Sequence, residues 1–103
     1  MLEPDSLCDV AFRYARWLRE TGQWDAMDLF TWVIHPAIGA LAGRGKTKVS
    51  DIDCALVTRS LRVAVQDRID PALAAGAWAD FIDYLEAEGI PHGPLLDALA
   101  VPL

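Results

Sequence analysis

Apolar residues recur at steps of three and four from residue 7 onward, which is the spacing of one face of an α-helix. The residues that share this face are Leu7, Val10, Ala11, Tyr14, Trp17 and Leu18. On the opposite side, acids and bases stand four residues apart, as pairs that stabilise a helix: Asp9 with Arg13, and Arg16 with Glu20. With Ser6 as a cap and Gly22 as a stop, the pattern predicts an amphipathic helix over about residues 7–21.

The second apolar segment is different, because the fifteen consecutive residues from 29 to 43 carry no formal charge. A helix that is apolar on all sides belongs in a core or against a partner, since its exposure to water forfeits about 25 cal/mol per Å². We therefore expect this helix to form the centre of the fold, with Trp32 buried. Pro36 lacks a backbone N–H, which predicts a kink there. The run is shorter than the roughly 20 residues that cross a bilayer, so no membrane insertion is expected.

A basic loop that contains two glycines occupies residues 43–48 and predicts an exposed connection. Ser50, with Asp53 three residues later, is typical of a helix cap, so the third helix is expected to start directly after the loop. The main apolar stripe of this helix consists of Cys54, Val57, Leu61, Ala64, Val65 and Ile69.

The chain restarts at Asp70 and Pro71, which are typical of a cap and a first helical residue. A last substantial helix is predicted over about residues 77–88, with Gly89 as its stop. Its inward residues are expected to be Trp78, Phe81, Ile82 and Leu85. Residues 93–103 are expected to add one short helical turn.

No segment alternates apolar and polar residues over the length of a strand, so the sequence predicts an all-α fold. A chain of 103 residues suits one domain, and we expect a single helical domain over residues 1–103. The aromatic residues lie in two groups, between residues 12 and 32 and between residues 78 and 84. The expected architecture is a compact bundle of four to five helices, in which the first helical hairpin packs against the last long helix.

The net charge of −6 is distributed unevenly along the chain. Residues 44–68 carry six bases and three acids, whereas residues 69–103 carry six acids and no base. Such an acidic chain is poorly suited to nucleic acid, because affinity for phosphates comes from clustered Lys and Arg. A helical DNA-binding regulator is nevertheless an alternative, in which the third helix reads the duplex and these bases meet phosphate: Arg44, Lys46, Lys48, Arg59 and Arg62.

The sequence has no residue spacing that is typical of a catalytic or cofactor-binding site. Zinc sites use close ligand pairs, and the soft ligands here are far apart: Cys8, His35, Cys54 and His92. Residues 39–47 end like a phosphate-binding loop, but Ala40 stands where the first glycine is required and no strand precedes the loop. We expect no catalytic, cofactor or metal-binding residue. A small enzyme or enzyme subunit whose site is invisible in the sequence is a second alternative.

Acidic residues on the last helix are the strongest candidates for a binding surface. Asp80, Asp83 and Glu86 follow one another at three-residue steps. Like charges at helical spacing destabilise an exposed helix by about 0.2–0.5 kcal/mol per pair. Three main interpretations are open: a solvated face, an ion-pair network with Arg59 and Arg62 within the fold, or a set of carboxylates presented to a basic protein surface. A carboxylate acid–base or metal site is the weakest, because no pocket residue accompanies these acids.

The uncharged second helix also predicts self-association. A bundle of this length covers only part of that helix, which leaves a patch around Ile38 and Leu41 for a two-fold homodimer. Taken together, the features predict a small protein that acts by binding another protein, as an adaptor, inhibitor or immunity-type factor, without catalysis. The acidic start of the sequence lacks the features of a signal peptide, so we expect a cytoplasmic protein.

Overall fold

A computed structural model describes residues 6–90 and 92, and the regular structure in them is helical. The elements are α1 (Leu7–Glu20), α2 (Trp24–Leu29), η1 (Phe30–Ile34), α3 (His35–Ala42), η2 (Val49–Asp51), α4 (Cys54–Gln66) and α5 (Pro71–Ala87). A single antiparallel bridge joins Ser6 to Lys48 and ties the start of α1 to the connection before η2. The predicted all-α bundle is therefore confirmed. The short turn predicted for residues 93–103 lies outside the described residues.

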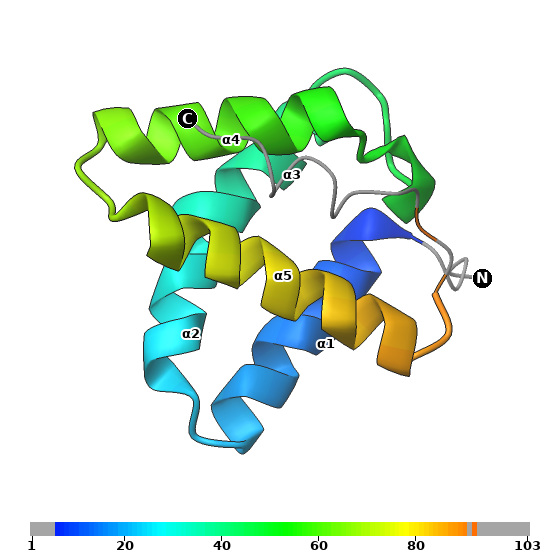
Figure 1. The fold of residues 1–103 in the computed structure, drawn as a ribbon. Helices are drawn as coiled ribbons and strands as arrows, with labels where there is room; N and C mark the ends of the chain where they lie inside the picture. The colour runs from blue at the N-terminus through cyan, green and yellow to red at the C-terminus, as the bar shows by residue number, and fades with distance from the viewer. Residues whose placement is uncertain (1–5, 91, 93–103) are drawn as a thin grey trace.

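The segments α2, η1 and α3 form one continuous helix, here called the central helix, over residues 24–42. It contacts α1, α4 and α5, and it changes direction between α2 and α3 (Figure 1). The middle segment η1 is π-helical, and the His35 backbone N–H donates to the Phe30 carbonyl five residues before it. Pro36 follows directly, in the first turn of α3. The expected irregularity at this proline thus takes the form of a widened turn within an unbroken helix.

An aromatic cluster joins the first helical hairpin to α5, as the sequence predicts. The ring of Tyr14 in α1 lies 5.4 Å from that of Phe30 in η1 and 5.1 Å from that of Phe81 in α5, between ring centroids. Trp78 contacts Phe81 edge to face at 6.1 Å and is fully buried. Aromatic rings in such tilted contacts stabilise a core beyond the area that they bury.

A short hydrogen-bonded chain crosses the apolar core and connects three elements. The indole Nε1–H of Trp78 donates to Ser60 Oγ at 3.0 Å, and the Ser60 hydroxyl donates to the Val33 carbonyl at 3.0 Å. Because a buried polar group is costly without a partner, these two bonds specify how α5, α4 and η1 meet.

The structure contradicts one expectation about burial and two about where helices begin. The predicted burial of Trp32 fails, because its side chain is 69% exposed while Phe30, Val33 and Ile34 of the same segment face the core. Even an uncharged helix has one side that the bundle does not cover.

The two later helices begin at other residues than predicted. Ser50 lies in the short 3-10 turn η2, and the cap of α4 is Asp53, whose carboxylate accepts the Leu56 backbone N–H at 2.8 Å. Asp70 caps α5 at the predicted place, by accepting the Ala72 N–H at 2.8 Å. From there α5 runs without a break, so this helix starts at Pro71 and not near residue 77. None of the helices in residues 6–90 has both the length and the apolar character needed to cross a membrane.

Candidate functional site

A cleft of about 370 Å³ opens between α1 and the C-terminal half of α5. It combines aromatic rings with carboxylates, and no base contributes to its wall. Its lining residues are Tyr14, Trp17, Gln23, Asp80, Asp83, Tyr84, Ala87 and Glu88. We call this feature the acidic aromatic cleft.

The α5 wall of the cleft follows from helical geometry. Residues three or four apart lie on the same side of a helix, which places Asp80, Asp83 and Tyr84 along one strip. On the other side of α5, Trp78 and Leu85 are fully buried in the core. Because the core side anchors the helix, the backbone of α5 places both aspartates on the surface that lines the cleft.

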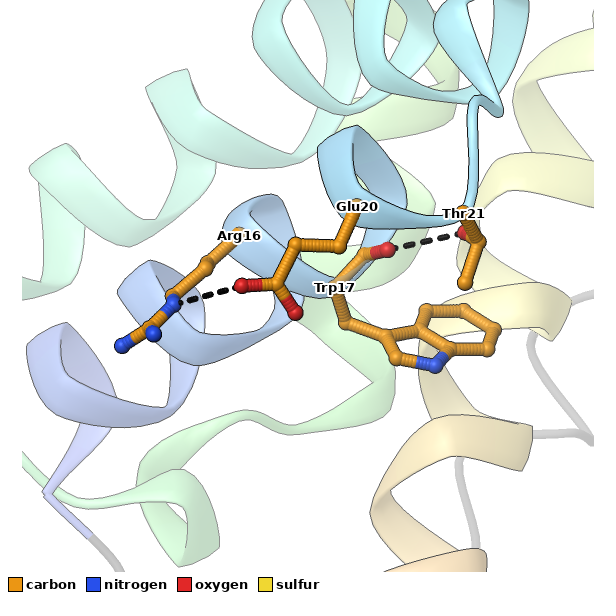
Figure 2. Close-up of polar contacts among 4 residues, drawn as sticks. All are labelled: Arg16, Trp17, Glu20 and Thr21. Atoms are coloured by element: carbon orange, nitrogen blue, oxygen red, sulfur yellow. Dashed lines mark hydrogen bonds and ion pairs between the residues drawn. The ribbon is translucent and has the colours of Figure 1, made fainter.

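The α1 wall ends in the indole of Trp17, which is 42% exposed. The Thr21 hydroxyl donates to the Trp17 carbonyl at 2.8 Å and closes the last turn of α1. Figure 2 shows the indole pointing away from the ion pair of Arg16 with Glu20, whose Nε and Oε1 atoms are 2.9 Å apart. The indole reaches Tyr84 of α5, with 5.6 Å between ring centroids. The expected ion pair of Arg16 with Glu20 is confirmed, and it leaves Trp17 at the cleft.

The acidic residues predicted on α5 divide into two sets. Asp80 and Asp83 line the cleft, and both are exposed. Glu86 does not line it, and its Oε1 lies 3.3 Å from His92 Nε2. Glu88 takes the third acidic position of the cleft.

No ion pair joins Asp80 or Asp83 to a base within the part of the chain that the structure describes. The predicted alternative of pairing with Arg59 and Arg62 is therefore not found there. The two carboxylates face solvent beside the aromatic rings, without a counterion from residues 6–90 or 92.

The tyrosines of the cleft keep their protons more strongly than free tyrosine does. Burial, reinforced by the charges of Asp80 and Asp83, raises the pKa of Tyr14. Burial and the neighbouring Glu88 raise the pKa of Tyr84. At neutral pH both hydroxyls are thus neutral groups that can donate or accept a hydrogen bond. The ring of Tyr14 is 2% exposed, and its hydroxyl has no hydrogen-bond partner among the described residues.

The patch predicted around Ile38 and Leu41 is wrong as an exposed surface. The two side chains are 5% and 4% exposed and belong to the core, because α1 and α4 pack against α3. Each contributes only to the floor of a groove, Ile38 beside α1 and Leu41 beside α4. A homodimer stays a prediction, now without this surface to support it.

Two of the grooves that lie away from the acidic aromatic cleft are formed between elements of the bundle. One of about 140 Å³ runs between the central helix and α4, and the exposed Trp32 lines it together with Arg44 and Arg59. The other, of about 430 Å³, lies between α1 and the central helix and brings Cys8 and His35 to one apolar surface. Within residues 6–90 and 92, no three His, Cys, Asp and Glu side chains are grouped so that they could hold a metal ion.

The sequence reasoning missed the aromatic half of the cleft. Tyr14 and Trp17 fit the apolar stripe of α1, and the amphipathic character of Tyr and Trp was the one available signal that they could face a surface. No protein-family model matches this chain, and comparison with curated proteins and with solved structures also finds no match.

Proposed function

We propose that this protein acts by binding a basic region of another protein through the acidic aromatic cleft, without catalysing a reaction. The role is that of an adaptor, inhibitor or immunity-type factor. The observation that carries the proposal is the pair of carboxylates, Asp80 and Asp83, that lack a described counterion and flank the partly exposed Trp17.

The combination of residue types supports this function on physical grounds. Trp and Tyr are enriched among the residues that contribute most to binding energy in protein interfaces. A cation over such a ring gains about 0.5–1 kcal/mol at an exposed site and more when water is excluded. The net charge of −6 also attracts a basic partner over distance and accelerates the encounter.

The test is a comparison of two charge-reversal variants with the same change in net charge. Asp80→Lys with Asp83→Lys alters the cleft, whereas Asp25→Lys with Asp28→Lys alters exposed acids on α2. Proteins retained by the immobilised parent are identified by mass spectrometry and purified, and their Kd for each variant is measured by calorimetry.

We expect the cleft variant to bind at least about tenfold more weakly, equivalent to about 1.4 kcal/mol, while the α2 variant stays close to the parent. Both variants should melt within a few degrees of the parent, because all four positions are exposed. Parent binding should weaken as salt rises from about 0.1 M to 1 M, where the screening length falls from about 10 Å to 3 Å. Equal losses in both variants, or no retained protein that binds when purified, would contradict the proposal.

A further inference from the structure

The three rings of the acidic aromatic cleft touch one another and do not enclose a space. Tyr14 lies 6.1 Å from Trp17 and 5.0 Å from Tyr84, and Trp17 lies 5.6 Å from Tyr84, between ring centroids. The angles between the ring planes are 23°, 50° and 36° for these pairs. An aromatic cage for a quaternary ammonium needs the cation itself within about 6 Å of several ring centres. Here the rings fill that space, and together they form a platform.

The Tyr14 hydroxyl opens onto the same cleft, and no described residue hydrogen-bonds to it. Tyr14 is 2% exposed, yet its side chain lines the cleft with Asp80 and Asp83. No hydrogen bond to this hydroxyl exists among residues 6–90 and 92. The hydroxyl is therefore available to hydrogen-bond to water or to a polar ligand group that enters the cleft.

We propose that the acidic aromatic cleft binds the guanidinium group of one arginine side chain of the partner. The planar guanidinium stacks on the partly exposed indole of Trp17, which extends sideways from the last turn of α1 (Figure 2). Its parallel N–H donors bind the carboxylate of Asp83 or Asp80, and a further N–H donates to the Tyr14 hydroxyl oxygen. This inference rests on the proposed function and names the chemical group that is recognised.

Arginine fits this arrangement better than lysine for two geometric reasons. A guanidinium is flat, and it can stack on a ring while it donates in its own plane to a carboxylate. The lysine ammonium is a compact, strongly hydrated charge that can approach the carboxylates but cannot stack on the platform. A platform beside two carboxylates therefore selects for shape as well as for charge.

The test uses three capped tripeptides, acetyl-Gly-X-Gly-amide, in which X is arginine, lysine or citrulline. Citrulline has the shape of arginine without its charge. Binding to the full chain is followed by NMR, through the indole N–H of Trp17 and the amides of α5. We expect saturable shifts with the arginine peptide, a Kd about five to ten times weaker for the lysine peptide, and a Kd at least tenfold weaker for the citrulline peptide.

Two conservative variants test the named contacts without emptying the core. Tyr14→Phe removes only the unpartnered hydroxyl, and it should weaken the arginine peptide about threefold or more. Asp83→Asn should weaken it at least as much, whereas the matched control Asp25→Asn on α2 should leave its Kd unchanged. A folded Tyr14→Phe protein with parent affinity, or equal Kd values for the arginine and lysine peptides, would overturn the inference.

The failure of this inference can be distinguished from the failure of the proposed function. A purified partner could bind through Asp80 and Asp83, while no single Arg→Lys change in that partner weakens its affinity more than replacement of one of its other basic residues does. In that case the arginine site is wrong and the binding function stands. If the arginine peptide binds as described but no protein partner is retained, the site stands and the proposed function is wrong.

Discussion

Replacement of Ser60 by alanine tests the hydrogen-bonded chain that crosses the core. The Ser60 hydroxyl accepts from Trp78 Nε1 at 3.0 Å and donates to the Val33 carbonyl at 3.0 Å. Trp78 is fully buried, so its indole N–H cannot turn to water when the hydroxyl is removed. Ser60→Ala changes little volume, which makes the lost hydrogen bonds the main cause of any change in stability.

The expected cost is the sum of two contributions. A buried indole N–H left without an acceptor costs about 1–3 kcal/mol, and the lost bond to Val33 costs about 0.5–1.5 kcal/mol. Together they give about 1.5–4.5 kcal/mol, a large fraction of the roughly 5–15 kcal/mol that stabilises a small domain. At about 4–8 °C per kcal/mol for a chain of this size, we expect Tm to fall by roughly 6–36 °C.

Thermal and urea unfolding followed by circular dichroism measure this change. The exposed Ser50→Ala variant is the control and should differ from the parent by no more than about 0.5 kcal/mol. Trp78→Phe removes the indole donor, so it should cost less in the Ser60→Ala background than in the parent, with a coupling of about 1 kcal/mol. A Ser60→Ala protein that melts within about 3 °C of the parent would show that this reasoning is wrong.

Three further predictions follow from burial, capping and ionisation. Trp32→Ala should change stability by no more than about 0.5 kcal/mol, because its indole is 69% exposed, whereas Trp78→Ala should cost about 3–5 kcal/mol; comparable melting losses would contradict this difference. Asp53→Ala should cost about 0.5–2 kcal/mol in urea unfolding and Ser50→Ala almost nothing, and the opposite order would place the cap of α4 at Ser50. The fold raises the pKa of Tyr14, so the protonated side chain stabilises the folded state in full below the ordinary tyrosine pKa of about 10. This stabilisation is lost as pH rises above that value, because Tyr14 ionises first in the unfolded chain. Tyr14→Phe should therefore show a smaller decline in Tm between neutral pH and about pH 11, and parallel curves would refute this cause.

Local patterns in the sequence predict most of the helices, although α4 and α5 begin at other residues than expected. The three- and four-residue spacing in α1, the cap at Asp70 and the irregularity near Pro36 all reflect interactions between residues within about one or two helical turns. The distribution of aromatic residues also indicated which helices meet, and the contacts of Tyr14 with Phe30 and Phe81 agree with it. Such features are local or follow from composition, so they can be read without coordinates.

The tertiary structure alone decided which sides of these helices are covered. Trp32 stands in the middle of an uncharged helix, yet it is exposed, because α1, α4 and α5 cover the sides that carry Phe30, Val33 and Ile34. The acidic aromatic cleft depends on the same non-local packing. It brings Trp17 of α1 beside Asp83 of α5, residues that are far apart in the chain. Helical periodicity specifies the relative positions of residues on one helix, whereas the orientation of that helix in the bundle depends on the packing of all its neighbours.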